Sequence, residues 1–263
     1  METLTAKVNG IEMDYFTFGT GKRTFVIIPG LSLKNVMLSA RMVAAAYKQF
    51  NEDFTTYVFD RRKNVSDGYS IREMAHDTAE VMKSIGIESA DIFGASQGGM
   101  IAQFIAIDSP EIVHSIVLGS ASSRVNDAII ETFDGWLGFA EKHDVKSLNH
   151  SFFERIYSDA FLEKYKKALP LIEQDGTAEE CERFLIFARA CLSFNAYNEL
   201  EKIKCPVLVL GAENDKVLSG AASYEIAEKL GCEIYMYGDG YNHAVYDEAP
   251  DYKDRIMSFF NKI

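Results

Sequence analysis

Short apolar runs that alternate with helix-like segments are the feature that most constrains the fold of this chain. Each run has the length of a strand, and such continuous runs are typical of strands that are covered on both faces. The expected strands of the first half lie at residues 12–18, 24–28, 56–59, 91–93 and 112–118. Helical patterns occupy residues 36–50, 70–85 and 97–107. This order predicts a parallel sheet with helices on both faces.

Local signals mark the ends of several of these elements. The turn sequence Gly19-Thr-Gly21-Lys22 ends the first strand, and the charged segment Asp60-Arg61-Arg62-Lys63 is expected to end the third. Ser70-Ile-Arg-Glu73 has the pattern of a capping box, in which both side chains satisfy backbone N–H groups at a helix start. We expect Arg61 and Arg62 to form surface ion pairs, with contact to an acidic substrate group as the alternative.

The alternation stops after the fifth strand. Residues 122–200 show no convincing strand but carry helical patterns that are rich in aromatic residues. The alternation then resumes with strands at 206–210 and 233–237 and helices at 220–230 and 250–260. We therefore predict a core domain formed by residues 1–121 and 201–263, with residues 122–200 inserted as a helical cap.

The segment Gly94-Ala95-Ser96-Gln97-Gly98 lies between an expected strand and an expected helix. In this G-x-S-x-G context a serine sits at the tip of a tight strand-to-helix turn, with its hydroxyl raised above the carboxyl end of the sheet. Side chains at Gly94 and Gly98 would collide with neighbouring backbone in such a turn, so glycine is the residue that fits. The helix N-terminus at this point also favours developing negative charge.

On this motif, its strand and helix context and the order of the elements, the whole chain resembles the α/β-hydrolase superfamily. The resemblance implies an α/β fold with a mostly parallel, doubly wound sheet and an inserted helical cap. It also implies that Ser96 is the nucleophile. In that family the catalytic residues follow the chain order serine, acid, histidine.

That order implies where the other two catalytic residues lie. His243 is the only one of the five histidines that follows the last expected strand, where the family has its histidine. Asp215 lies just beyond the strand that ends at Gly211, where the family has its acid. Glu213 is the nearest rival for the acid, followed by Asp239, which is close to His243 and suits a turn with the next glycine.

The resemblance also implies an oxyanion hole made of two backbone N–H groups. One donor is the N–H of Gln97, directly after the nucleophile. The other is the N–H of Leu31 in the loop Pro29-Gly30-Leu31, where proline replaces the histidine that the family often has. Leu31 is expected either to line the binding pocket or to pack in the core.

The activity that the resemblance implies is hydrolysis of a carboxylic ester or related acyl compound through an acyl-enzyme, without a metal or organic cofactor. Relatives with the same three residues include carbon–carbon bond hydrolases, lyases, lactonases and perhydrolases, which stay as alternatives. A receptor for a small molecule with little turnover is an alternative of another class. The aromatic cap suggests a substrate with an apolar portion.

Composition narrows the partners and the compartment. The formal net charge of −12 argues against nucleic acid, which requires a clustered basic surface. No apolar run approaches the length of about 20 residues that spans a bilayer, and the N-terminal residues lack the apolar stretch of a signal peptide. We therefore expect a cytoplasmic protein.

The four cysteines give no sign of a metal site, because none forms a C-x-x-C pair and their spacing does not fit one. They are Cys181, Cys191, Cys205 and Cys232.

Overall fold

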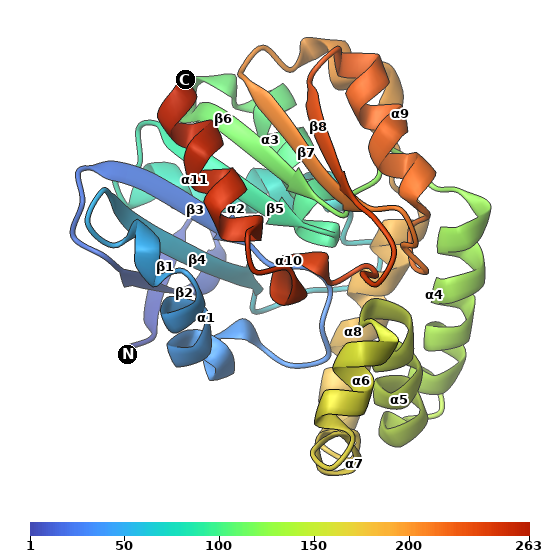
Figure 1. Ribbon diagram of the computed structural model, residues 1–263. Coiled ribbons are helices and arrows are strands. Elements are labelled where there is room, and N and C mark those ends of the chain that lie inside the picture. The colour runs from blue at the N-terminus through green and yellow to red at the C-terminus, as the bar shows by residue number, and fades with distance from the viewer.

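Eight strands form one sheet in the order β1-β2-β4-β3-β5-β6-β7-β8. The computed structural model describes residues 1–263 and is drawn in Figure 1. The strands are β1 (Leu4–Val8), β2 (Ile11–Phe18), β3 (Arg23–Ile28), β4 (Phe54–Arg62), β5 (Ala90–Ala95), β6 (Val113–Gly119), β7 (Val207–Ala212) and β8 (Glu233–Tyr237). Strand β2 is antiparallel to both β1 and β4, and every pair from β4 to β8 is parallel. The predicted mostly parallel sheet is thus confirmed.

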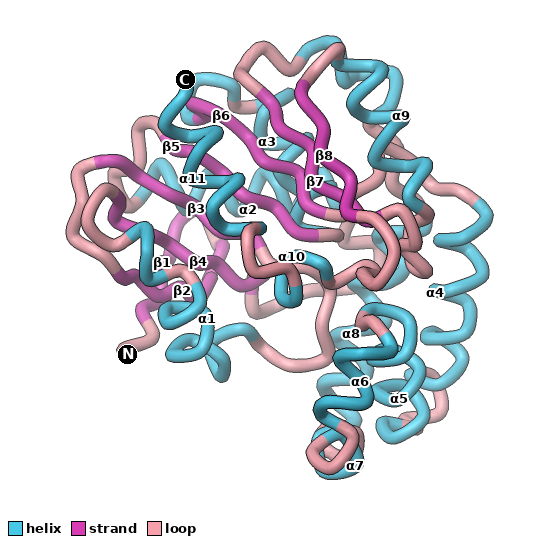
Figure 2. Tube along the Cα trace, in the orientation of Figure 1, coloured by secondary structure: helices cyan, strands magenta, loops and turns pink.

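Helices cover both faces of this sheet (Figures 1 and 2). The helices of the core are α1 (Ala40–Ala46), α2 (Ile71–Ser84), α3 (Gln97–Asp108), α9 (Gly220–Leu230), α10 (Val245–Glu248) and α11 (Tyr252–Lys262). Buried residues of α2, α3 and α9 pack in one hydrophobic cluster, and those of α1, α10 and α11 pack in the other. The fold is therefore doubly wound, with one hydrophobic layer on each side of the sheet.

The continuous apolar runs of the sequence follow from this double burial. In β3, Phe25 and Ile27 belong to the cluster on the α11 side, whereas Val26 and Ile28 belong to the cluster on the α3 side. Successive side chains of a strand point to opposite faces, so a strand that is covered on both faces has apolar residues at every position.

Several elements differ from the sequence-based expectation, among them the short helix α10, which was not expected. Strand β4 does not end at the charged segment but runs on to Arg62, because β2 extends alongside it and pairs Met13 with Arg62. The helix expected at residues 36–50 is divided into the 3₁₀ turn Val36–Ser39, helix α1 and a second 3₁₀ turn, Lys48–Phe50. Strand β1 was not expected, although its five residues LTAKV alternate between apolar and polar, and only Ala6 among them is buried.

Between β6 and β7 the chain forms only helices and short turns. These helices are α4 (Asp127–Ala140), α5 (Val145–Ile156), α6 (Asp159–Tyr165), α7 (Leu169–Ile172) and α8 (Ala178–Leu192), with a 3₁₀ turn at Tyr197–Lys202. The one strand-like pairing in this part is an isolated bridge between Arg124 and Asn195. In Figure 1 these helices lie beyond the ends of the parallel strands. We propose to treat residues 122–200 as the cap and the flanking segments as the core.

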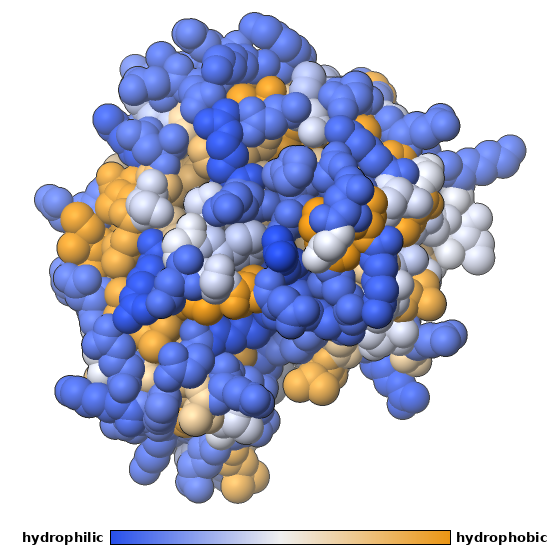
Figure 3. Space-filling view, turned by 180° about the vertical axis from the view of Figure 1, so that it is seen from behind, coloured by the Kyte–Doolittle hydropathy of each residue, from blue (hydrophilic) through white to orange (hydrophobic).

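The surface is largely polar on the side that Figure 3 shows, where apolar residues form only small, scattered groups. None of the helices is both long and apolar enough to cross a bilayer.

Phe25 tests how far the layer on the α11 side stabilises the fold. Its ring is fully buried and packs against Tyr47, Phe50, Phe54 and Phe260. We expect Phe25→Ala to lower the free energy of unfolding by about 3–5 kcal/mol, since it removes a large buried ring and leaves a cavity. Urea denaturation followed by circular dichroism measures the loss. The matched control is Leu38→Ala at an exposed position, which should change it by less than about 0.5 kcal/mol.

Candidate active site

Ser96 occupies the turn between β5 and α3 in a strained backbone conformation. Its φ is 52° and its ψ is −118°, which a residue with a side chain rarely adopts. The flanking glycines make the turn possible. A Cβ at Gly94 would lie 2.4 Å from the carbonyl oxygen of Gly98, and a Cβ at Gly98 would lie 1.9 Å from the carbonyl oxygen of Ile28. Both distances are far below van der Waals contact, so α3 can approach the sheet only with glycine there.

Asp215 and His243 come together from the loops that follow β7 and β8. The Nδ1 atom of His243 lies 2.8 Å from Oδ2 of Asp215, and both side chains are 3% exposed. The second carboxylate oxygen of Asp215 accepts hydrogen bonds of 2.8 Å from the N–H groups of Val217 and Leu218. Both carboxylate oxygens are therefore fixed, and the aspartate holds the imidazole ring through Nδ1 so that Nε2 is left for other contacts.

Asn242 links these two loops to each other and to the cap. Its Oδ1 accepts hydrogen bonds from the N–H of His243 at 2.8 Å and from the N–H of Lys216 at 2.9 Å. Its side-chain amide donates to the carbonyl oxygen of Tyr157 at 3.1 Å. The N–H of Ala244 also donates to a cap residue, through the carbonyl of Ile156 at 2.7 Å. The position of the histidine thus depends on the end of helix α5.

The other candidates point elsewhere. Glu213 accepts a hydrogen bond of 2.5 Å from the hydroxyl of Tyr224, and Asp239 accepts one of 3.0 Å from Asn214. Neither rival acid bonds to His243. The remaining histidines bind other carboxylates or are exposed: His114 contacts Asp91, His143 contacts Glu182, His150 contacts Glu173, and His76 lies on the surface of α2.

Ser96 and His243 line the same cavity, which has a volume of about 340 Å³. The side chains of Phe133, Trp136, Phe152, Phe153, Ile156 and Tyr157 form its wall on the side of the cap. The Ser96 hydroxyl makes no hydrogen bond with another group of the protein. In enzymes without substrate, catalytic hydrogen bonds are often long and tighten only when substrate binds. The cavity therefore offers a small molecule access to both side chains.

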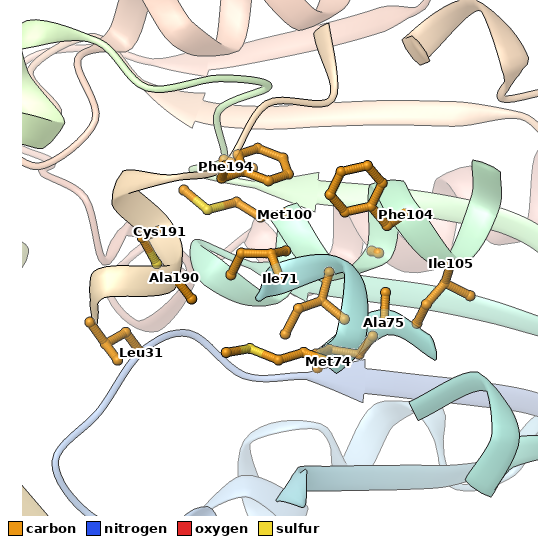
Figure 4. Packing of buried hydrophobic residues seen from close by; sticks show 14 of the residues in the cluster. Leu31, Ile71, Met74, Ala75, Met100, Phe104, Ile105, Ala190, Cys191 and Phe194 are labelled. Atoms are coloured by element: carbon orange, nitrogen blue, oxygen red, sulfur yellow. The ribbon is translucent and has the colours of Figure 1, made fainter. Parts of the chain in front are cut away.

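The loop after β3 runs directly beside the serine. A Cβ at Gly30 would lie 3.2 Å from the Cβ of Ser96 and 3.8 Å from its hydroxyl oxygen. Leu31, the next residue, is 8% exposed and belongs both to the cavity wall and to a hydrophobic cluster. Figure 4 shows this cluster, where Leu31 lies near Ala190 and Cys191 at the end of α8. The two expectations for Leu31, pocket lining and core packing, are both met.

Gln97 is the first residue of α3, where backbone N–H groups have no acceptor within the helix. Its side chain is buried and donates to the carbonyl oxygen of Phe187 at 2.9 Å and to the sulfur of Cys191 at 3.1 Å. Burial raises the pKa of that cysteine to about 12, so its thiol stays protonated. Gln97 therefore joins the turn at Ser96 to cap helix α8.

The expected surface ion pair is wrong for Arg61, whereas Arg62 does form one. Arg61 is 4% exposed and has no carboxylate partner; it donates to the carbonyl oxygen of Pro29 and to the side chain of Gln97. Arg62 is partly exposed and pairs with Asp77 at 3.4 Å. The two residues are consecutive in a strand, so their side chains point to opposite faces of the sheet. The charged segment gave no sign of this difference because strand β4 was expected to end before it.

Sequence analysis also missed Asn242 and Asp247. Asn242 bonds through backbone groups of other segments, which no local pattern reveals. Asp247 lines the cavity at an exposed position of α10; desolvation by the surrounding protein raises its pKa to about 6, while nearby Lys253 lowers it. No cluster of three or more metal-binding side chains occurs, and all four cysteines are free thiols.

A serine on a strand-to-helix turn, which shares a cavity with the histidine of a buried aspartate and histidine pair at the carboxyl edge of a parallel sheet, is the arrangement of a class of hydrolytic enzymes. The model of the α/β-hydrolase fold family matches residues 23–250. The chain belongs to this family and is a hydrolase.

Curated relatives share low identity over most of the chain. RutD of Rhizobium rhizogenes, which is named as a carbamate hydrolase, is 24% identical over 216 residues, covering 79% of this chain and 82% of its own. The 3-oxoadipate enol-lactonase 2 of Acinetobacter baylyi is 20% identical over 234 residues, covering 87% of this chain and 85% of its own.

Solved structures agree on the fold. The α/β-hydrolase MGS-M2 from a deep-sea metagenome has a TM-score of 0.86 at 19% identity and covers 98% of this chain and 97% of its own. The enol-lactonase of Burkholderia xenovorans has a TM-score of 0.84 at 19% identity and covers 98% of this chain and 100% of its own. At such identities these likenesses show the fold and leave the substrate open.

Gly98→Ala tests the contact that positions the strand-to-helix turn at Ser96. Its Cβ would overlap the carbonyl oxygen of Ile28, so the helix or the strand end must shift. We expect the free energy of unfolding to fall by about 3 kcal/mol or more, since overpacking against backbone is poorly relieved. Urea denaturation is the measurement. In the control Gly135→Ala, a helical site with open space, stability should rise by about 0.5–1 kcal/mol. Equal behaviour of the two variants would contradict the argument.

Proposed function

We propose that this hydrolase cleaves a carboxylic ester or a related acyl compound through a covalent acyl-enzyme on Ser96. The observation that supports this most is the buried Asp215 and His243 pair, whose histidine lines one cavity with the serine of the strand-to-helix turn. A serine hydroxyl needs a base to become a nucleophile, and a base that an acid orients meets that need.

In the acylation step the Ser96 oxygen attacks the carbonyl carbon of the substrate while Nε2 of His243 takes the hydroxyl proton. The carbonyl oxygen becomes an oxyanion, and the backbone N–H groups of Leu31 and Gln97 donate hydrogen bonds to it. Asp215 stabilises the imidazolium that forms. When the tetrahedral intermediate collapses, the bond to the leaving group breaks, and His243 returns the proton to that group.

In the deacylation step the same groups act on water. His243 takes a proton from a water molecule as its oxygen attacks the acyl carbon, and the oxyanion forms again in the same place. The ester bond to Ser96 then breaks, the serine oxygen recovers its proton from His243, and the carboxylic acid leaves. No metal or organic cofactor takes part in either step. The free thiols fit a cytoplasmic enzyme.

The cavity wall suggests which substrates fit. Cap aromatics make one side apolar, which suits an acyl or alcohol portion of hydrocarbon character. The charged side chains that line the cavity carry an excess of negative charge. Lys34 is already paired with Asp175 at 2.8 Å and with Glu180 at 3.0 Å, whereas Asp247 has no ion pair. We propose that the substrate is a small molecule that carries no carboxylate near Asp247.

The roles of Ser96 and His243 are tested on purified protein with 4-nitrophenyl butyrate as the substrate. Ser96→Ala and His243→Ala should each lower kcat by about 10⁴–10⁶-fold. The serine and the histidine act together in the attack, so loss of either one removes the activated nucleophile. Ser96→Ala should also abolish covalent labelling by a fluorophosphonate, which reacts with an activated serine.

The acid is tested by a matched pair of variants two residues apart. Asp215→Ala should lower kcat by about 10⁴-fold, since the imidazole loses the group that orients it. Glu213→Ala should change kcat less than about threefold, because Glu213 bonds only to Tyr224. The reverse ranking would overturn the assignment of the acid, and normal turnover by Ser96→Ala would overturn the proposed function.

Asp247 predicts a pH-dependent choice between neutral and anionic esters. The measurement compares kcat/KM for 4-nitrophenyl butyrate and 4-nitrophenyl hemisuccinate between pH 5.5 and 8, where the free carboxyl of the hemisuccinate, with an ordinary pKa of about 4.3, is almost fully charged. A carboxyl with a pKa of about 6 is neutral below that pH and charged above it. Discrimination against the hemisuccinate should therefore grow by about 5- to 10-fold as the pH rises through 6.

Asp247→Asn is the control for this effect. Because its amide carries no charge, the ratio of the two kcat/KM values should become independent of pH. Protonation of His243 affects both esters alike and cancels in the ratio. A pH-independent ratio in the unmodified enzyme would place the acyl group of the substrate away from Asp247.

A further inference from the structure

Arg61 is a buried cation directly behind the two loops that carry the oxyanion donors. It lies near the end of β4, and its side chain reaches under the loop that follows β3. One guanidinium nitrogen, Nη2, lies 2.6 Å from the carbonyl oxygen of Pro29, 2.9 Å from Oε1 of Gln97 and 3.4 Å from the carbonyl oxygen of Gly30. The first two are full hydrogen bonds, and the third is a weaker shared contact.

No carboxylate neutralises this cation through a hydrogen bond. Its neighbour in sequence, Asp60, pairs with Arg183 of α8 at 3.1 Å. Arg183 also donates to the carbonyl oxygens of Arg61 and Arg62, so it holds the strand end. Burial lowers the pKa of Arg61, yet arginine stays protonated in proteins. An unpaired buried charge is costly, and three neutral acceptors repay it only in part.

Arg61 contacts both parts of the proposed oxyanion hole: the loop that carries the Leu31 N–H and the side chain of Gln97. The carbonyl of Gly30 and the N–H of Leu31 belong to one planar peptide unit, so a cation at the carbonyl polarises and orients that N–H. On the other side, Arg61 holds the side chain of Gln97, the residue whose backbone N–H is the second donor. The same side chain is also fixed to α8 through the carbonyl of Phe187.

We propose that Arg61 is a positioning residue for the oxyanion hole. It keeps the Leu31 and Gln97 N–H groups at the separation that a tetrahedral oxyanion needs, and its charge adds attraction for the negative oxygen from behind the donors. It touches neither the substrate nor the reacting atoms. This inference rests on the proposed serine hydrolase function.

In this role Arg61 stabilises the transition state more than it stabilises the bound substrate. The carbonyl oxygen of a bound ester carries little charge, whereas the oxyanion carries a full one. Groups that are held in advance toward the position of the developing charge therefore lower the barrier without tightening the ground state. Loss of Arg61 should reduce kcat and leave KM nearly unchanged.

The experiment compares Arg61→Met with Arg62→Met on 4-nitrophenyl butyrate. Methionine keeps much of the length of arginine but has no charge and no donor. We expect Arg61→Met to lower kcat by about 10- to 100-fold with KM changed less than twofold, which is less than the roughly 10²–10³-fold loss of an oxyanion donor itself. Arg62→Met should change both constants less than threefold, because that side chain bonds to Asp77 and Asn64 on the other face of the strand.

A pair of inhibitors separates positioning from a general loss of structure. An alkyl trifluoromethyl ketone adds the serine oxygen to its carbonyl and places an oxyanion in the hole, whereas the corresponding secondary alcohol binds the same cavity without forming one. In Arg61→Met the inhibition constant of the ketone should rise by about the same factor as kcat falls. The alcohol should bind as it does to the native enzyme. Arg61→Lys, which keeps the charge and a donor, should recover part of both losses.

Two results would overturn the inference. One is a folded Arg61→Met variant whose kcat stays within threefold of the native value. The other is an equal loss of affinity for the ketone and the alcohol, which would make the role of Arg61 structural. If Arg61→Met does not fold by circular dichroism, Arg61→Gln is measured in the same way and decided by the same two results. If Ser96→Ala still turns over substrate normally, the proposed function itself is wrong. If Ser96→Ala is inactive but Arg61→Met has a normal kcat, only the role of Arg61 is refuted.

Discussion

The close approach of the α3 backbone to the end of β3 is the constraint on which the site depends. A Cβ at Gly98 would lie 1.9 Å from the carbonyl oxygen of Ile28, so the two segments can be this close only because position 98 has no side chain. The contact places Ser96 at the head of α3 and brings the loop after β3 alongside it. One backbone contact therefore positions both Ser96, the proposed nucleophile, and the loop that carries Leu31, a proposed oxyanion donor, and the strain at Ser96 is sustained by the packing around it.

The aspartate and the histidine reach the same edge because β7 and β8 are parallel to the strands at the centre of the sheet. Carboxyl ends of parallel strands share one edge, and the loops that leave them form the site. Asn242 then joins both loops to the end of α5, and Gln97 joins the turn at Ser96 to α8. The cap is thus more than a cover for the cavity, since its helices help to hold groups on both sides of it.

Much of the fold could be predicted from local patterns. The capping box at Ser70 does start α2, and the limits of α9 and β8 agree with the expected ones, because caps, glycines and apolar periodicity act over a few residues. Strand β4 was predicted too short because its charged end is held by pairing with β2, a segment distant in sequence. Pairing of that kind overrides local composition, since charged side chains can extend from a strand when their partners lie nearby.

By itself the sequence determined the alternation of strands and helices from β2 onward, the tight turn at Ser96 and the single histidine that follows the last strand, because each depends on neighbouring residues or on their order. Only the tertiary structure decided that Asp215, and not Glu213, contacts His243, and that Arg61 lies buried against Pro29 and Gln97 instead of on the surface. Adjacent residues in a strand have almost the same local signal but point to opposite faces. Their surroundings are set by segments that meet only when the chain has folded, and these surroundings give each charged group its role.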